Sequence, residues 1–542
     1  MSNGLIAFFV YAFLGLVVGA LVAALDWVTV DLALDSVLSA PLGVQLVLPA
    51  IGMLAVWAII NFWPGASSDT SDAYVASFHS GEGAEAKTLV PRLLASFATI
   101  GSGGAVGVEG PAVVTGATLG QVMGRRVPKA LGERPRLVLL VAGAAAGIAA
   151  IFKAPATGVL FAIEVPYQRD VSRHGLIPAL VAAATSYLTY ITLRDDDPLF
   201  AFPSISEVEL SDELIAAFSI GLLSGVIAKG LARGVHWAKG LQNRYSFLLR
   251  FPIASITLAA SLVIANELID RPITLGLGSE IAAEIVLDNE VTLLAIVVLF
   301  ILRGLVTGAT IGVGGVGGVF IPLVVQGLLL GRAVELIVGA PSTGLYPVIG
   351  LAAVLGAAYR IPLAAIMFVA ETTGRAEFVI PALIATAIAQ SMMGNDTVAP
   401  GQRTERRGQL ERRLVEPASV VMLDDLGVVS PDEQLLDVID SYGGRGESFA
   451  VPVGGPHYLG LMVLHDLAAA MLENGPDSTV REAMRELPAV PHNAPAIDAA
   501  RLMNEHDTAA IAVVDDDNIP IGIISTTSLA GLKSADIGIG ID

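Results

Sequence analysis

The sequence predicts an all-α polytopic membrane domain built from two related halves, followed by a small α/β unit that is itself duplicated. Three observations predict this fold class. The 542 residues are 54% hydrophobic and only 15% charged, whereas soluble proteins average about 25% charged residues. The net charge of −20 is uneven, because the residues from Leu414 onward hold 21 acidic and 5 basic side chains. A 22-residue segment of the first half recurs in the second.

The membrane domain is predicted from nine apolar runs in the first 393 residues. Several have the roughly 20 residues that a helix needs to span a bilayer, and others are shorter or interrupted by Gly and Pro. Broken helices at membrane depth are tolerated where they line a cavity. The runs are residues 4–34, 41–63, 135–163, 211–235, 251–266, 291–309, 319–339, 345–371 and 377–393.

A basic linker and a soluble unit come after the last run. Five arginines lie between Arg403 and Arg413, and the positive-inside rule places such a segment, together with the residues after it, in the cytoplasm. Beyond about residue 415 the pattern changes, because short β-rich runs alternate with amphipathic helical stretches. The predicted strands are 448–453, 458–464, 509–515 and 520–525, and the predicted helices are 432–442, 465–473, 478–486 and 495–506.

The membrane domain contains an internal repeat. Residues 99–120 match residues 310–331 at 13 of 22 positions, an offset of 211, and residues 153–164 resemble residues 360–371 at an offset of 207. We therefore divide the domain into halves at about 1–195 and 211–402. Such duplication is typical of transporters whose broken helices point their N-termini at a site near the midplane.

Each copy of the first repeat places glycines before a Pro and an uncharged apolar helix. A helix N-terminus in this setting attracts anions, because its N–H groups are unpaired and its dipole end is positive. Two such ends would hold a small anion without a fixed cation, which suits rapid permeation. Glu109 is the carboxylate in this segment. It is predicted to occupy the anion position itself and to leave when protonated or displaced.

At these residues the chain resembles the CLC family of chloride channels and chloride/proton exchangers. Residues 107–111 (GVEGP) resemble its G-x-E-G-P motif, and residues 318–322 (GVFIP) its G-x-F-x-P motif. The resemblance covers residues 1–402 and implies the inverted-topology CLC fold and a homodimer with one anion pathway per subunit. It also implies an external gate at Glu109 and anion binding by the backbone of Gly107, Val108, Gly110, Val319, Phe320 and Ile321.

The chain departs from the family pattern at three places. Asp69 falls where the family has an inner serine, so that Ser68 or Thr70 is an alternative source of the anion-binding hydroxyl. Ala399 occupies the place of the family's central tyrosine, at the inner gate. Val165 stands where exchangers often carry the internal glutamate that relays protons.

These departures leave two readings of the function open. The main prediction is a voltage- or pH-gated chloride channel, because valine carries no proton. The alternative is a chloride/proton antiporter, since some family exchangers also lack the internal glutamate. A CBS-bearing cation transporter is a more distant alternative, which would need several carboxylates in the membrane. We find no nucleophile, metal cluster or acid–base pair at membrane depth, and we therefore expect no enzyme and no catalytic or metal site.

The tail resembles a pair of CBS domains, at residues 417–474 and 479–533, with a short tail at 534–542. In nucleotide-binding members a Ser or Thr contacts phosphate and an Asp three residues later contacts ribose. The first copy keeps only Asp466 and the second only Ser525. We expect no required cofactor, and an adenine nucleotide is only weakly supported, because few basic residues are present to hold phosphates.

Composition also indicates which partners and which cellular location to expect. The acidic balance argues against nucleic acid as a partner, because phosphate binding needs a basic face. Chloride and the lipid bilayer are the expected partners, and a multi-pass protein of the plasma membrane is the expected location. An acidic, lysine-poor soluble surface fits a cytoplasm rich in salt, which predicts a halophilic prokaryote as the source.

Overall fold

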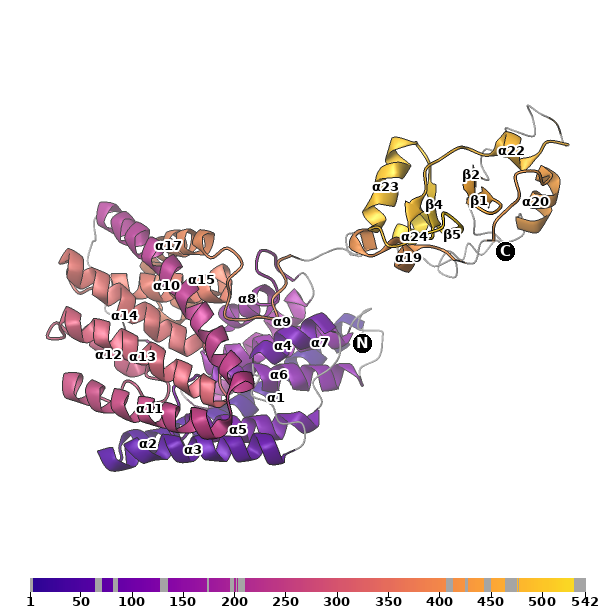
Figure 1. Ribbon diagram of the computed structural model, residues 1–542. Coiled ribbons are helices and arrows are strands. Elements are labelled where there is room, and N and C mark those ends of the chain that lie inside the picture. The colour runs from indigo at the N-terminus through magenta and orange to yellow at the C-terminus, as the bar shows by residue number, and fades with distance from the viewer. Residues whose placement is uncertain are drawn as a thin grey trace. The chain divides into compact units, whose positions relative to one another are not determined.

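The computed structural model describes residues 3–63, 71–80, 86–126, 135–172, 175–194, 199–200, 202, 210–405, 413–424, 427–442, 450–463, 475 and 477–530. The chain forms two compact units, Met1–Arg406 and Arg407–Asp542 (Figure 1). The first consists of packed helices, and the second combines short helices with two small sheets. The predicted domain limits inside these units remain predictions.

The first half of the membrane unit begins with a long helix that runs through a π-helical stretch, Trp27–Leu34, without a break. Both halves then consist of helices of very different lengths. The first half contains α1 (Asn3–Asp26), α2 (Asp35–Leu38), α3 (Leu42–Phe62), α4 (Ser71–Ser80), α5 (Leu89–Ile100), α6 (Glu109–Gly124), α7 (Pro135–Ile151), α8 (Pro155–Glu164) and α9 (Leu176–Leu193). The second contains α10 (Leu210–Arg244), α11 (Phe247–Ile269), α12 (Ser279–Ile285), α13 (Leu293–Val313), α14 (Phe320–Val338), α15 (Leu345–Tyr359), α16 (Pro362–Thr373) and α17 (Val379–Met392).

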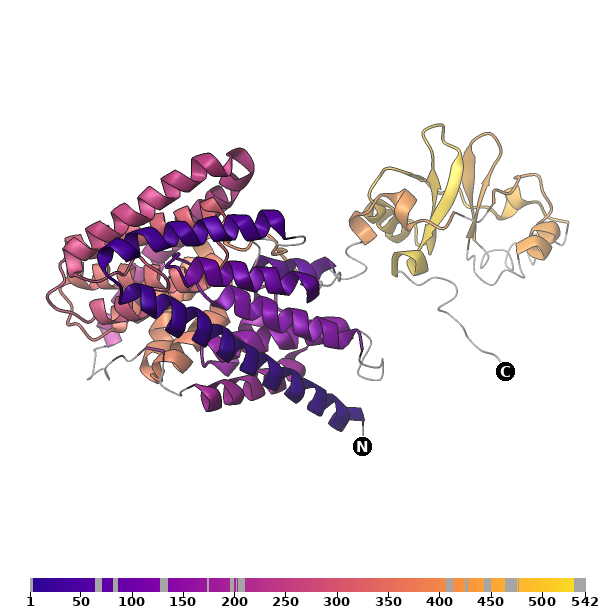
Figure 2. The same cartoon turned by 90° about the horizontal axis from the view of Figure 1, so that it is seen from below.

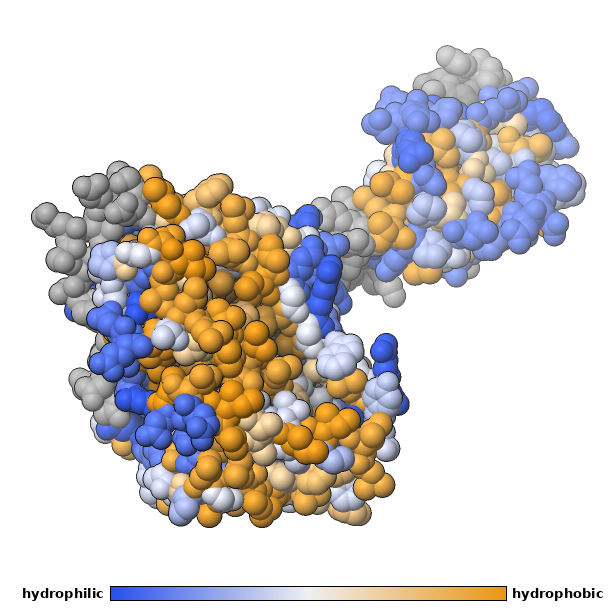
Figure 3. All heavy atoms as spheres, turned by 60° about the vertical axis from the view of Figure 1, so that its left-hand side comes forward, coloured by the Kyte–Doolittle hydropathy of each residue, from blue (hydrophilic) through white to orange (hydrophobic). Residues whose placement is uncertain are grey.

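The surface of this unit matches a lipid environment. Among the described residues, seven helices are long and apolar enough to cross a membrane. Figure 3 shows a broad apolar surface bounded by hydrophilic residues on both sides. Large apolar side chains of this unit, such as Ile253, Ile256 and Leu294, are exposed. A soluble protein rarely exposes so large an apolar area, and the prediction of a polytopic membrane domain is confirmed.

The structure divides two of the apolar runs that hydropathy alone predicts to be continuous. The run 135–163 contains α7 and α8, and the run 345–371 contains α15 and α16. At the breaks, Lys153 (φ 53°) and Arg360 (φ 61°) adopt left-handed backbone conformations. In each case a Pro then opens the next helix, where its missing N–H is tolerated. The predicted runs also omit α9, whose Ser, Thr and Tyr residues lower its hydropathy.

Repeat-related glycines let helices pack at backbone contact. A Cβ added at Gly116 of α6 would lie 1.9 Å from the carbonyl oxygen of Gly143 in α7. In the second half, a Cβ at Gly327 of α14 would lie 2.5 Å from the carbonyl oxygen of Gly350 in α15. Small residues allow this close approach in membrane helices. The same packing therefore occurs once in each half.

The C-terminal carboxylates of α8 and α16 cap each other's helix. Glu164 accepts hydrogen bonds from the N–H groups of Leu363 (3.1 Å) and Ala364 (2.8 Å) at the start of α16. Glu371 accepts them from Ala156 (2.9 Å) and Thr157 (2.8 Å) at the start of α8. The two helices are consequently antiparallel, as inverted repeats require. These carboxylates satisfy N–H groups that a helix start leaves unpaired.

The second unit is an α/β pair of similar halves. Strand β1 (Ala450–Gly454) pairs antiparallel with β2 (Tyr458–Val463), and β4 (Ala510–Val514) pairs antiparallel with β5 (Pro520–Ser525), with β3 (Val490–Pro491) parallel to β4. Figure 2 shows the two hairpins side by side. The described helices are α19 (Ala418–Val421), α20 (Leu435–Tyr442), α22 (Val480–Ala483), α23 (Ala496–Glu505) and α24 (Thr526–Ala530).

In each half of this unit, the segment that precedes the half forms backbone hydrogen bonds with a strand of the other half. Leu423 and Ile523 exchange backbone hydrogen bonds of 2.8 and 3.0 Å, so the first half's leading segment pairs with β5 of the second. Leu461 of β2 and Arg485 exchange two bonds of 2.9 Å in the same way. This reciprocal pairing fits the predicted duplicated α/β unit. The predicted helix 465–473 lies outside the described residues.

Candidate anion-binding site

The two glycine segments lie against each other at the centre of the membrane unit. Gly107 and Gly318 form an antiparallel bridge, with N–H to carbonyl distances of 2.9 and 2.8 Å. The side chain of Thr99 accepts from the N–H of Val316 (2.9 Å), and that of Thr310 accepts from the N–H of Ala105 (3.2 Å). The two threonine contacts correspond to each other in the repeat, because Thr310 and Val316 lie 211 residues after Thr99 and Ala105. The repeat thus builds one site from two halves.

This pairing brings two helix N-termini together. Glu109 is the first residue of α6, and Phe320 is the first residue of α14. Glu109 is fully buried, and its Oε1 accepts a hydrogen bond from the N–H of Phe320 at 2.6 Å. Its Oε2 has no hydrogen-bond partner among the described residues. A carboxylate therefore occupies the helix end where an anion is predicted to bind.

Glycine is required beside this carboxylate for steric reasons. A Cβ at Gly107 would lie 1.8 Å from Oε2 of Glu109, and a Cβ at Gly318 would lie 2.0 Å from Oε1. Real Cβ atoms essentially never come within 3.0 Å of another heavy atom in this way. Any larger residue at either position would displace the carboxylate. The two motif glycines are thus required by the position of the Glu109 carboxylate.

The other residues predicted for the site fall in two groups. Val108 and Gly110 are buried beside Glu109 at the start of α6, and Val319 and Ile321 flank Phe320 at the start of α14; all four are therefore close to the carboxylate. Ser68, Asp69 and Thr70 lie outside the described residues, so their assignment stays a prediction.

A cavity of about 330 Å³, hereafter the vestibule, lies beside the glycine bridge. It is lined by Gly317, Gly318 and Val319, and by residues that the motifs do not single out. These are Ser71 and Asp72 at the start of α4, Lys239 and Gln242 of α10, and Tyr359 at the end of α15. Lys239 forms an ion pair with Asp72, so that this lysine is largely neutralised. The vestibule thus places polar side chains beside the residues that precede α14.

The two positions predicted to replace family residues, Ala399 and Val165, both contact Gln402, whose N–H donates to the carbonyl oxygen of Ala399 at 3.1 Å. Ala399 and Val165 are both buried. Between them, the side-chain amide of Gln402 donates to the carbonyl oxygens of Val165 (2.9 Å) and Tyr359 (2.8 Å). Thr397 donates to the Gln402 side-chain oxygen at 2.5 Å. Neither Ala399 nor Val165 lines the vestibule, whereas Tyr359 does.

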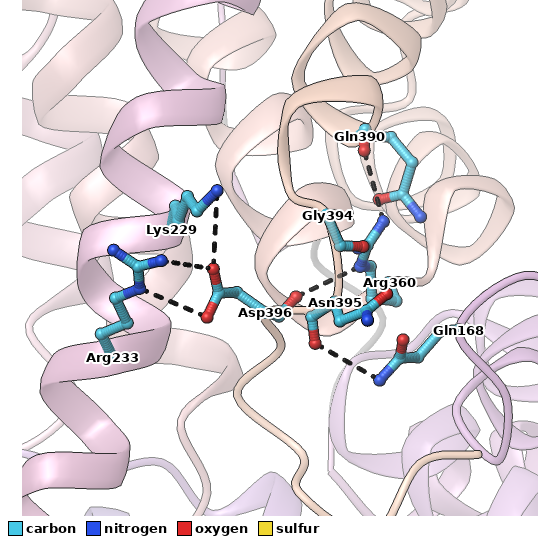
Figure 4. A network of polar contacts seen from close by, with 8 residues as sticks. All are labelled: Gln168, Lys229, Arg233, Arg360, Gln390, Gly394, Asn395 and Asp396. Atoms are coloured by element: carbon cyan, nitrogen blue, oxygen red, sulfur yellow. Dashed lines mark hydrogen bonds and ion pairs between the residues drawn. The ribbon is translucent and has the colours of Figure 1, made fainter. Parts of the chain in front are cut away.

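The segment that carries Ala399 is held in place by a polar network (Figure 4). Asp396 contacts Lys229 (3.6 Å) and Arg233 (3.1 Å), both on α10. The Arg360 guanidinium donates to the carbonyl oxygens of Asp396 (3.2 Å), Gln390 (3.3 Å) and Gly394. These contacts tie the segment that carries Ala399 to α10 and to the Arg360 side chain at the end of α15.

A second cavity, of about 510 Å³, reaches Glu164. Its lining includes Glu164, Gln168, Arg169, Arg360 and Gln390. Both oxygens of Glu164 are used in capping α16. These contacts give Glu164 a structural, capping role.

Of the two positions predicted to contact a nucleotide, only Ser525 lies among the described residues, and nucleotide binding stays a prediction. Asp466 lies outside the described residues. The Ser525 hydroxyl contacts that of Thr527 (2.7 Å) and accepts from the N–H of Ser528 (3.1 Å). The Ser528 hydroxyl in turn accepts from the N–H of Ser525 at 2.9 Å. Both hydroxyls are thus engaged at the start of α24. Among the described residues, no group of three His, Cys, Asp or Glu side chains could hold a metal ion.

Two family models match the chain. Residues 51–394 match the voltage gated chloride channel family, and residues 476–533 match the CBS domain. The first match covers more than half of the chain and includes both glycine segments.

Individual relatives agree with these matches. A putative ClcB-like chloride channel protein of Ralstonia nicotianae is 28% identical over 361 residues, which are 64% of this chain and 82% of the relative. A ClcA H⁺/Cl⁻ exchange transporter of Vibrio cholerae is 26% identical over 360 residues, or 61% of this chain and 73% of the relative. The crystal structure of a CLC-type fluoride/proton antiporter shares the fold, with a TM-score of 0.64 and 24% identity over 75% of this chain and 100% of the other.

Proposed function

This chain belongs to the voltage gated chloride channel family and transports small anions, and we propose that it exchanges chloride or a similar anion for protons, with Glu109 as the gate. The observation that carries the proposal is the position of the Glu109 carboxylate. It lies on the N–H of Phe320 at the start of α14, the group predicted to bind the anion. The carboxylate and a chloride would therefore compete for one place.

This competition links protons to anions. A negative carboxylate blocks the helix end, and protonation removes the charge that holds it there. Binding of a proton and binding of an anion then favour each other, as thermodynamic linkage requires. Alternating occupancy of one site by carboxylate and anion is the minimum that an exchanger needs. The name of the Vibrio cholerae relative, an H⁺/Cl⁻ exchange transporter, supports this function.

A passive chloride channel is the second candidate. The observation in its favour is Val165, a buried apolar side chain at the place of the internal proton-relay glutamate. The Ralstonia nicotianae relative carries the name of a chloride channel protein. A channel with the same gate would let protons regulate opening without moving across in proportion to chloride.

The measurement that decides between the two is the reversal potential of the purified protein in vesicles under combined chloride and proton gradients. An exchanger gives a value that depends on both gradients, and an outward chloride gradient drives proton uptake. A channel gives the chloride equilibrium potential and no such proton movement. Absence of chloride flux in every condition contradicts both candidates.

The remaining assignments come from the family and are proposed with the function. We propose a homodimer in the plasma membrane, with the residues after Arg406 in the cytoplasm. A cation transporter with CBS domains is not favoured, because the described membrane helices offer no cluster of carboxylates for a metal ion. Chemical cross-linking of the protein in its membrane tests the dimer.

A further inference from the structure

The vestibule contains a phenol that the motif pattern does not predict. The position of the family's central tyrosine is held by Ala399, which does not line the vestibule. Tyr359 does line it, and it comes from a different element, the last residue of α15. In the internal repeat, Tyr359 corresponds to Phe152, which lies 207 residues earlier. A hydroxyl is thus present near the helix ends although the expected tyrosine is absent.

The hydroxyl of Tyr359 is directed at the site. It lies close to the Ser71 side chain and to the backbone N–H of Val319, and both residues line the same vestibule. The Ser71 hydroxyl is buried and has no hydrogen-bond partner among the described residues. Two hydroxyls and the N–H of Val319, the residue just before α14, therefore lie together at the vestibule. Neutral donors gathered in this way fit a small anion that has lost water.

Tyr359 is also held rigidly. Its carbonyl oxygen accepts from the side-chain amide of Gln402 at 2.8 Å. Its ring packs between Phe320 (centroids 6.1 Å apart) and Phe161 (6.0 Å). The side chain is 2% exposed. A donor fixed in this way loses little conformational freedom when it binds an ion.

We propose that Tyr359 is an anion-binding residue, whose hydroxyl donates a hydrogen bond to the transported anion at the Val319–Phe320 end of the vestibule. Ser71 is the second hydroxyl at this place. The phenol thus reaches the anion from the end of α15, and it supplies the donor that Ala399 cannot. The proposal rests on the proposed function, because it assigns a ligand to the same anion.

The test compares Tyr359→Phe with Tyr74→Phe in the full-length protein. Both remove the hydroxyl of a buried tyrosine, but that of Tyr74 donates to the carbonyl oxygen of Ala162 (2.6 Å), and Tyr74 does not line the vestibule. Chloride binding to the purified protein is measured by calorimetry, in the Glu109→Gln background so that no carboxylate competes. Loss of a hydrogen bond to a charged group weakens binding by about tenfold, or about 1.4 kcal/mol.

We expect this tenfold loss of chloride affinity in Tyr359→Phe and no change in Tyr74→Phe. Equal affinities in the parent and in Tyr359→Phe overturn the assignment of Tyr359 while leaving the proposed function intact. No chloride binding in the parent overturns both. If Tyr359→Phe does not assemble, Tyr359→Met, which also lacks the donor, must show the same loss of affinity, and an unchanged affinity there overturns the assignment.

Discussion

At the scale of single residues, the proposed gate depends on the negative charge of Glu109 at the start of α14. Glutamine has nearly the shape of glutamate but cannot lose a proton, so Glu109→Gln removes both the negative charge and its titration. We expect chloride flux of the wild type in vesicles to rise as the pH falls, because protonation releases the carboxylate from the helix end. Flux of Glu109→Gln should be high and nearly independent of pH.

The matched control for this gate is Glu377→Gln, which changes an exposed carboxylate at a turn before α17. It should keep the pH dependence of the wild type. A Glu109→Gln variant with the wild-type pH profile contradicts the gate assignment, whatever its absolute flux.

The glycines beside the carboxylate permit a second test at this scale. In Gly318→Ala the new Cβ would lie 2.0 Å from Glu109 Oε1, so the carboxylate cannot keep its place. We expect this variant to resemble Glu109→Gln in chloride flux, with most of the pH dependence lost. Gly308→Ala is the control, because a Cβ at Gly308 meets nothing within 4 Å. Retained pH gating in a folded Gly318→Ala protein contradicts the steric argument.

The sequence predicts the residues of the gate but not the lining of the vestibule. Glu109 is identified because it is the carboxylate of a repeated glycine segment, and Phe320 because its segment resembles the family's G-x-F-x-P motif. Ser71 and Tyr359 look ordinary, and only the meeting of α4, α14 and α15 gives them a role. The sequence offers one indication for Tyr359: in the second repeated segment it occupies the position that corresponds to Phe152.

At the scale of elements, α8 and α16 are joined by reciprocal caps. Glu371→Gln replaces a carboxylate that accepts from the N–H groups of Ala156 and Thr157 with an amide that has one acceptor oxygen. We expect a loss of about 1–3 kcal/mol of stability, because hydrogen bonds to charged groups are stronger than neutral ones. The measurement is the thermal unfolding midpoint of the purified protein in detergent.

The repeat provides the partner experiment. Glu164→Gln should lower the midpoint by a similar amount, because it removes the corresponding cap at Leu363 and Ala364. Glu377→Gln should leave the midpoint unchanged. If both capping variants unfold at the wild-type temperature, the caps contribute nothing measurable and Glu164 is free for another role, such as proton transfer from its cavity.

Elements are predictable where hydropathy is sustained and are missed where it is interrupted. The long helices α3, α11 and α13 match apolar runs closely. The breaks inside 135–163 and 345–371 depend on left-handed residues at Lys153 and Arg360, which no hydropathy value reveals. The breaks could have been predicted from Pro155 and Pro362, which follow these residues by two positions, because Pro favours the first turn of a helix.

At the scale of the whole molecule, most of the net negative charge lies on the second unit. From Leu414 onward, 5 basic residues face 21 acidic ones, so most carboxylates cannot form an ion pair. Ion pairs such as Arg481 with Asp432 are largely exposed and contribute little. Mutual repulsion of the remaining carboxylates opposes the folded state unless salt screens it.

We therefore propose a salt-rich cytoplasm as the working environment, and the prediction concerns the soluble unit of the full-length protein. In dilute buffer, amide hydrogen exchange in β1, β2, β4 and β5 should be roughly tenfold faster than in molar potassium chloride, equivalent to about 1.4 kcal/mol of opening free energy. Peptides from α6 and α7 are the internal control, because these helices are buried and nearly uncharged, and their exchange should not change with salt. Equal protection of the strands in both buffers would mean that the acidic surface is tolerated without screening, and the halophilic assignment would then be wrong.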